Sequence, residues 1–237
     1  MLTKVDEAYL KYYKEKFVDT CPICHGTFPS CTCWKNYKLE IAKISANIPV
    51  KFRGFKLKQL THPQLQKQKE KIKKYIIDLQ ENRFNGKSLY IYGTKGTAKT
   101  MCASIVIMNA LKQGFKAYYF ESMKAVAEML KQDWRTDDTK LTTILTEYDY
   151  VAIDNMGAEV INNETVVDTL KSLFTIRANN LLPIIFVSPY SVAKIDLELD
   201  TPVIELFKPV LQDLYFNGFD YQEEILNKRG KKATKGN

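Results

Sequence analysis

The feature that most constrains this chain is a glycine- and threonine-rich segment between an apolar run and a helical pattern. Residues 88–92 (Ser-Leu-Tyr-Ile-Tyr) predict a strand, and residues 99–112 predict a helix that is closed by Gly114. The segment that joins them consists of Gly93, Thr94, Lys95, Gly96, Thr97, Ala98, Lys99 and Thr100. Its spacing follows G-x-x-x-x-G-K-[ST], the pattern of a phosphate-binding loop, with alanine in place of the last glycine.

In this pattern the backbone amides of the loop and the positive end of the following helix bind nucleotide phosphates. Lys99 is expected to bridge the β and γ phosphates of ATP, and Thr100 to ligate Mg²⁺. Ala98 places a methyl group in a crowded turn, where a positive φ would cost on the order of 1 kcal/mol. A generic strand-to-helix turn is the alternative, but the flanks, the glycines and the Lys-Thr pair together favour phosphate binding.

A second anchor is Asp154, which ends the apolar run at residues 149–153 and is expected to hold Mg²⁺ through water. Asn155 follows it where many hydrolases have a water-activating glutamate. Glu159 is the near substitute, although an exposed loop carboxylate is the simpler interpretation. A strand predicted at 116–120 intervenes in the chain, an order typical of P-loop ATPases with an inserted strand between the two motif strands.

Short apolar runs alternate with helical patterns through the rest of this region, which predicts an α/β fold with a parallel sheet. Tyr118, Tyr119 and Phe120 are expected in the core. Residues 63–83 predict one amphipathic helix. Further elements are expected as helices at 123–134, 165–180 and 200–214 and a strand at 183–187. We divide the chain into an N-terminal domain (1–45), a linker with the amphipathic helix (46–86), an ATPase domain (87–227) and a basic tail (228–237).

Four of the five cysteines lie within thirteen residues: Cys21, Cys24, Cys31 and Cys33. Two short chelating pairs joined by a turn can close a tetrahedron of thiolates, which predicts a structural Zn²⁺ site in a reducing cytoplasm. His25 could replace one ligand, and an unmetallated thiol cluster is the alternative. Cys102 stands apart and is expected in the core.

The charge balance, 35 Lys and Arg against 27 Asp and Glu, gives a net charge of +8. This balance favours polyanion partners such as nucleic acid but also serves solubility. The lysine-rich stretches 67–74 and 228–235 are candidates for contact with DNA, with a solvated surface as the simpler interpretation. The sequence has no apolar run of about 18 residues and no signal-peptide pattern, so no membrane partner and a cytoplasmic location are expected.

The order of parts resembles the DnaC/DnaI-type replicative helicase loaders, especially phage-like ones, and the related IstB-type transposition ATPases. The resemblance spans nearly the whole chain and rests on the cysteine cluster, Ala46-Asn-Ile-Pro-Val-Lys-Phe52, the loop at 93–100, and Ile153-Asp-Asn-Met-Gly-Ala-Glu159. It implies an AAA+ ATPase core behind a small zinc-bearing domain that contacts a hexameric helicase. It also implies contact with single-stranded DNA and nucleotide-dependent association with further copies of the chain, in a bacterial or phage-infected cell.

The sequence also departs from this family pattern. Ser188 stands at the position of the sensor residue, usually Asn, and with Lys99 and Asp154 completes the candidate catalytic set. Residues 200–214 lack the family's arginine and contain only the cation Lys208; Arg177 is a candidate replacement, although a helical surface arginine is the simpler interpretation. These departures predict weak or absent hydrolysis, with nucleotide as a conformational or assembly ligand. Two alternatives remain open: an IstB-like helper of a transposase, and a nucleotide-silent zinc scaffold.

Overall fold

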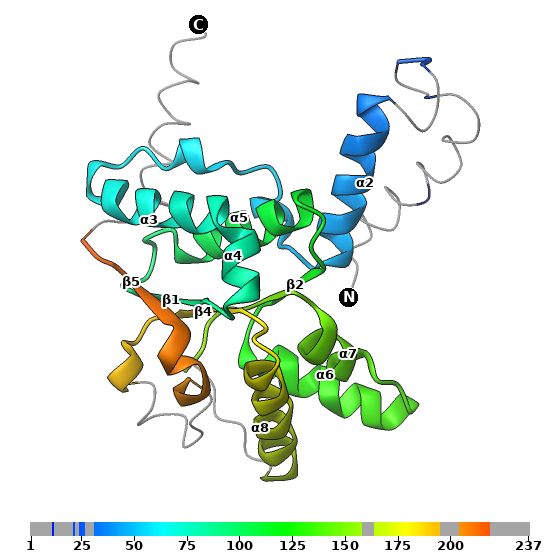
Figure 1. Cartoon of the computed structure of the whole chain (residues 1–237), viewed down its shortest axis with the longest axis vertical. Helices are drawn as coiled ribbons and strands as arrows, with labels where there is room; N and C mark the ends of the chain where they lie inside the picture. Colours follow the sequence, from blue (N-terminus) through cyan, green and yellow to red (C-terminus); the bar gives the residue numbers. More distant parts are fainter. Residues whose placement is uncertain are drawn as a thin grey trace, which may run out of the picture.

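The computed structural model describes residues 11, 21, 24–26, 31–157, 164–194 and 204–218. Within them, five parallel strands form one sheet in the order β2-β3-β4-β1-β5 (Figure 1). The strands are β1 (Ser88–Gly93), β2 (Ala117–Phe120), β3 (Tyr150–Ile153), β4 (Ile184–Ser188) and β5 (Leu211–Phe216). One strand lies between the motif strands β1 and β3, as predicted, but it is β4; the strand that intervenes in the chain, β2, lies at the edge of the sheet.

Helices cover both faces of the sheet because its strands alternate their apolar side chains between two cores. Leu89 and Ile91 of β1 face one core, and Tyr90 between them faces the other. The first core is covered by α3 (Gln66–Ile77), α4 (Leu79–Phe84) and α5 (Lys99–Lys112), with α2 (Thr32–Ser45) against α5. The second is covered by α6 (Met123–Thr136), α7 (Lys140–Glu147) and α8 (Glu164–Asn179) (Figure 1). None of the described helices combines the length and apolar character needed to span a membrane.

The connection from α2 to β1 is more broken than the single helix predicted for residues 63–83. The chain passes through three short 3₁₀ turns, η1 (Val50–Phe52), η2 (Leu57–Gln59) and η3 (Pro63–Leu65), before α3 begins. At Asp78 the backbone leaves helical geometry, with φ −90° and ψ 16°, and this residue separates α3 from α4. The predicted apolar face is confirmed, because Ile72, Tyr75 and Leu79 are buried against α5 and the sheet.

The α-helix predicted over 200–214 is wrong over the part that the structure describes, residues 204–214. A 3₁₀ turn, η4 (Glu205–Val210), is followed directly by β5, which pairs in parallel with β1. Pro209 lies inside the turn and lacks the amide hydrogen that a continuing α-helix requires. Because β5 is an edge strand, Gln212 and Asp213 can stay partly exposed, and this polar content hides the strand in the sequence.

Arg177 is neither a surface residue nor free to reach a neighbouring copy, so both interpretations made from the sequence are wrong. Its side chain is fully buried on the inner face of α8. The guanidinium donates hydrogen bonds of 2.5–3.3 Å to four backbone carbonyls, those of Leu145, Tyr148, Asp149 and Pro183. Burial lowers the pKa of Arg177 to about 9. The residue therefore ties α8 to the segment between α7 and β3 and to the start of β4.

Candidate nucleotide-binding site

The loop between β1 and α5 begins at a glycine that no other residue can replace without movement. Gly93 has φ 129°, and a Cβ built there would lie 1.8 Å from the carbonyl oxygen of Phe216 at the end of β5. The Thr94 amide donates a 3.1 Å hydrogen bond to the same carbonyl, and the Thr97 hydroxyl donates to the Thr94 carbonyl. The close packing of β1 on β5 therefore fixes where the loop turns.

Ala98 adopts the left-handed conformation, for which the sequence predicted a cost in free energy. Its φ is 69° and its ψ 17°, and it caps the N-terminus of α5. A Cβ in this region costs roughly 1–2 kcal/mol relative to the right-handed conformation. The turn into α5 therefore carries conformational strain at Ala98.

Lys99 lies folded over its own loop. Its Nζ donates hydrogen bonds to the carbonyls of Gly93, at 2.8 Å, and of Thr94, at 2.5 Å. Partial burial lowers the pKa of Lys99, and the negative charge of Asp154 acts in the opposite direction. Phosphate oxygens placed in the loop would offer this ammonium a charged acceptor instead of two neutral carbonyls.

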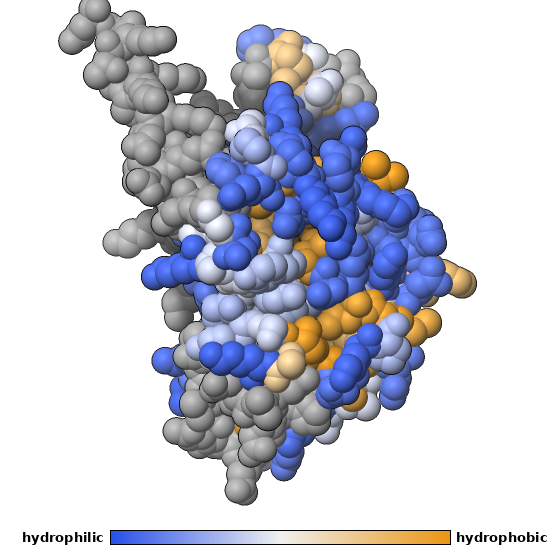
Figure 2. Space-filling view, turned by 90° about the vertical axis from the view of Figure 1, so that its left-hand side faces the viewer, coloured by the Kyte–Doolittle hydropathy of each residue, from blue (hydrophilic) through white to orange (hydrophobic). Residues whose placement is uncertain are grey.

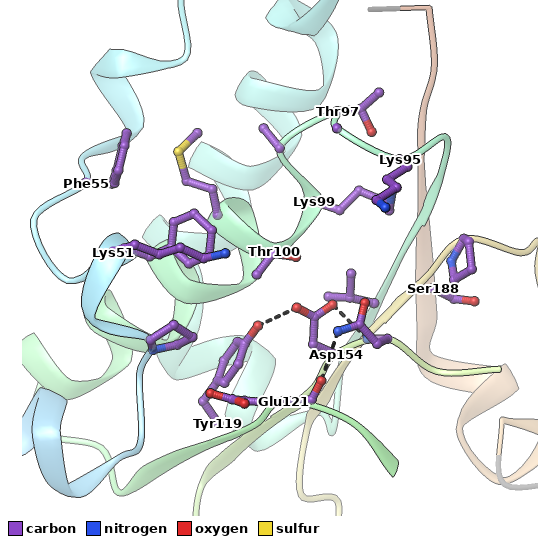
Figure 3. Close-up of a pocket in the computed structure, with 18 residues that line it drawn as sticks. Lys51, Phe55, Lys95, Thr97, Lys99, Thr100, Tyr119, Glu121, Asp154 and Ser188 are labelled. Atoms are coloured by element: carbon purple, nitrogen blue, oxygen red, sulfur yellow. Dashed lines mark hydrogen bonds between the residues drawn. The ribbon is translucent and has the colours of Figure 1, made fainter. Parts of the chain in front are cut away.

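Asp154 follows β3 and is almost completely buried, with 3% of its surface exposed. One carboxylate oxygen accepts a 2.6 Å hydrogen bond from the Tyr119 hydroxyl, and the other accepts from the Asn155 amide at 2.8 Å (Figure 3). Burial and the charge of Asp154 raise the pKa of Tyr119, so its hydroxyl stays protonated and donates. Thr100 lines the same cavity, which brings together the oxygen ligands that Mg²⁺ prefers.

These residues line one cavity of about 530 Å³, a size that suits a small-molecule ligand. One wall comes from the segment after α2, through Pro49, Lys51, Phe52 and Phe55. Figure 3 labels Lys51 and Phe55 of this wall. The family resemblance included part of this segment, but no prediction from the sequence placed the segment in the site. The contact joins residues about 45 positions apart in the chain, and no local pattern carries that information.

Asn155 and Ser188 line the cavity, but their polar groups already have partners. The Asn155 side-chain NH₂ group donates to the Glu121 carbonyl at 3.1 Å. The Ser188 hydroxyl donates to the Met156 carbonyl at 2.8 Å and accepts from the Tyr190 amide at 3.0 Å. Ser188 would therefore have to exchange a protein bond for a bond to ligand. Glu159 lies outside the described residues, whereas Glu121, which the sequence did not single out, lines the cavity at the end of β2.

The cysteine cluster lies next to the start of α2. The ligand atoms of Cys21, Cys24 and Cys33 lie within 4.8 Å of one another, compared with about 3.8 Å between thiolates that share a tetrahedral Zn²⁺ at 2.3 Å. Cys31 is outside this group of three; a backbone hydrogen bond at Trp34 lowers the pKa of its thiol, but burial and the neighbouring thiols of Cys21 and Cys24 raise it overall. A hydrogen bond with the Cys24 thiol is the main cause that raises the pKa of Cys33 to about 11. The donor set suits zinc, which holds such thiols as thiolates.

Comparison with known proteins identifies the fold. No protein-family model matches the chain, and no curated protein sequence does either. Among solved structures, the DnaC helicase loader is 20% identical with a TM-score of 0.61, and the alignment covers 71% of this chain and 100% of that one. DnaI is 15% identical with a TM-score of 0.60, over 71% of this chain and 94% of that one.

A third similar structure is the replication initiator DnaA bound to AMPPCP and single-stranded DNA. It is 15% identical with a TM-score of 0.61, and the alignment covers 78% of this chain but only 56% of DnaA. These similarities confirm, at the level of fold alone, the resemblance to DnaC and DnaI and the AAA+ fold that it implied. The resemblance to IstB-type ATPases stays a prediction.

Proposed function

We propose that this protein is an ATP-binding helicase loader, which delivers a hexameric replicative helicase to single-stranded DNA and hydrolyses ATP weakly. The observation that carries the proposal is the shared cavity of the phosphate loop, Asp154 and the segment at 49–55, in a fold similar to that of the DnaC helicase loader. The nucleotide is the part of this proposal that the described side chains support most directly.

In this proposal the triphosphate of ATP lies in the loop at 93–100. Lys99 contacts the β and γ phosphates, and Thr100 and Asp154 hold Mg²⁺, the latter through water. The base lies towards Phe52 and Phe55, which supply the apolar part of the cavity wall. AMPPCP, an ATP analogue, is bound in the similar DnaA structure, which supports the choice of an adenine nucleotide.

The zinc-bearing N-terminal domain is proposed as the contact to the helicase. Zn²⁺ would hold Cys21, Cys24 and Cys33, with Cys31 as the predicted fourth ligand, and would fix the start of α2. Such a closed site is structural, so its contribution is the shape of the docking surface and not the chemistry at the nucleotide.

The DNA contact is proposed on α3, where Lys67, Lys71, Lys73 and Lys74 are exposed. Figure 2 shows the face of the molecule on which α3 and β5 lie, and the surface around α3 is largely hydrophilic. Two of these lysines have acidic neighbours: Lys73 lies 3.7 Å from Glu70 and Lys74 2.9 Å from Asp78. Phosphate contacts of this kind weaken steeply as salt rises. The second lysine-rich stretch, 228–235, lies outside the described residues.

Weak hydrolysis follows from the engaged polar groups. Asn155 offers no base, the Ser188 hydroxyl is bonded within the protein, and the described residues 204–218 contain no arginine. Nucleotide would then serve mainly as a ligand that stabilises one conformation or assembly of the chain.

Affinity purification of the tagged full chain from its native host, with ATP at low salt, tests the proposal. We expect a hexameric replicative helicase among the copurifying proteins and its loss when Cys21 and Cys24 are changed to serine. A transposase in its place would contradict the loader and support the IstB-like alternative. Recovery of neither, from protein that retains zinc, would leave the zinc scaffold.

A further inference from the structure

We propose that Tyr119 is a positioning residue that joins the candidate magnesium ligand Asp154 to the segment leading to the N-terminal domain. This inference rests on the proposed function, because it assumes a magnesium nucleotide at Asp154. Tyr119 is fully buried in β2, and its hydroxyl donates a 2.6 Å hydrogen bond to Asp154. The bond fixes the orientation of a carboxylate that would otherwise rotate about its last torsion angle.

The backbone of the same residue holds the chain that enters the ATPase core. Because β2 is an edge strand paired only with β3, the outward amide and carbonyl of Tyr119 have no strand partner. The Tyr119 amide donates to the Ala46 carbonyl at 2.9 Å, and the Asn47 side chain donates to the Tyr119 carbonyl at 3.0 Å. The outward amide of Tyr119 is therefore bonded to Ala46, and its outward carbonyl is bonded to the next residue, Asn47.

The segment held in this way is continuous with the cysteine cluster. Ala46 is the C-terminal cap of α2, and Cys33 lies in the first turn of the same helix. The 14 residues of α2 span about 21 Å. Two residues beyond Asn47, Pro49 begins the wall of the cavity. One helix and one tyrosine thus connect the metal-ligand candidates at one end to the nucleotide cavity at the other.

A shift of Asp154 on binding Mg²⁺ would move the Tyr119 hydroxyl, and through β2 it would change the bonds to Ala46 and Asn47. The coupling is reciprocal, as any thermodynamic linkage is. A partner that displaces α2 would then lower the affinity of the chain for the magnesium nucleotide, and the bound nucleotide would stabilise the position of α2.

The test uses the full chain and two measurements. The first is the affinity for a fluorescent ATP analogue with Mg²⁺ and with EDTA, whose ratio isolates the magnesium contribution. The second is hydrogen exchange of residues 40–49 with and without the magnesium nucleotide. Tyr119→Phe removes only the hydroxyl, and Tyr118→Phe is the matched control, because Tyr118 lies on the same strand but faces the other core.

We expect Tyr119→Phe to keep the affinity measured in EDTA and to reduce the magnesium ratio about 10-fold, as is typical when an outer partner of a metal ligand is lost. Tyr118→Phe should leave the ratio unchanged. Asn47→Gly retains the positive φ of 57° at this position and removes one bond. It should keep the magnesium ratio and lose the nucleotide-dependent protection of residues 40–49.

Two outcomes would overturn the inference, and only the second would also overturn the proposed function. If the unmodified chain binds the magnesium nucleotide and Tyr119→Phe has the same ratio and exchange pattern, the inference alone fails. If the unmodified chain binds no nucleotide, the proposed function fails and the inference fails with it.

Discussion

Ala98 and Gly93 show how two single backbone positions shape the phosphate loop. The sequence marked Ala98 as the departure from the motif and gave the cost of a positive φ, and the structure has that φ. The constraint at Gly93 could not be predicted from the sequence, because the Phe216 carbonyl, with which a Cβ would clash, lies more than 120 residues away in the chain. Local conformational rules can thus be applied to a sequence, whereas contacts between distant segments need the fold.

Replacing Ala98 with glycine should stabilise the protein. Ala98→Gly removes the Cβ penalty of the left-handed conformation, and we expect a gain of about 1 kcal/mol in the free energy of unfolding. Chemical denaturation measures it. Ala103→Gly in the middle of α5 is the control and should lower stability by about 1 kcal/mol or more. A loss of stability on Ala98→Gly would show that the methyl group makes favourable contacts that outweigh the strain.

Adding a methyl group at Gly93 should have the opposite effect. A Cβ at 1.8 Å from the Phe216 carbonyl forces β5 or the loop to move, so Gly93→Ala should abolish nucleotide binding and lower the melting temperature. Gly54→Ala is the neutral control, since a Cβ there meets nothing within 4 Å. Unchanged binding by Gly93→Ala would mean that the loop does not hold the phosphates.

At the scale of elements, the sequence predicted most of the sheet and missed the parts that lack a simple pattern. β1, β3 and β4 are continuous apolar runs, as buried parallel strands require, and each lies within a residue or two of its predicted position. β5 was missed because an edge strand keeps polar residues, and the eight-residue α7 was missed because it is short. Arg177 was misplaced because helical spacing alone does not say which side of α8 meets the sheet.

Arg177 should therefore contribute to stability and not to catalysis. Arg177→Met keeps much of the side-chain volume but leaves the four carbonyls without the guanidinium donors, and we expect a loss of about 3 kcal/mol or more. Lys171→Met, on the exposed side of the same helix, should change stability by less than about 0.5 kcal/mol. Equal effects of the two substitutions, measured by urea denaturation, would contradict the structural role of Arg177.

In the whole molecule, α2 and the segment after it connect two expected ligand sites. One is the Zn²⁺ site at the start of α2, and the other is the nucleotide cavity. The motifs predicted an α/β fold with a parallel sheet, and the resemblance to the DnaC/DnaI-type loaders implied its AAA+ form. The wall formed by residues 49–55 was not predictable, since it depends on how the segment after α2 passes along β2. The domain boundaries at 45, 86 and 227 stay predictions.

Thiol chemistry should separate the cysteine cluster from the core cysteine. Burial raises the pKa of Cys102 to about 12, so almost none of this thiol is ionised at pH 8, and the native protein should protect it from a thiol reagent. We expect zinc to be present and to shield the cluster, chelation to expose the cluster thiols, and Cys102 to react only in denaturant. Rapid reaction of Cys102 in the native chain would contradict its place in the core.

The nucleotide site can be tested by an equilibrium titration of the full chain with a fluorescent ATP analogue, in Mg²⁺ and in EDTA. We expect saturable binding by the unmodified chain and a loss of affinity of at least about 10-fold for Lys99→Ala under both conditions. Asp154→Asn should lose only the part of the affinity that depends on magnesium. No saturable binding by the unmodified chain, or unchanged binding by Lys99→Ala, would show that the cavity is not a nucleotide site.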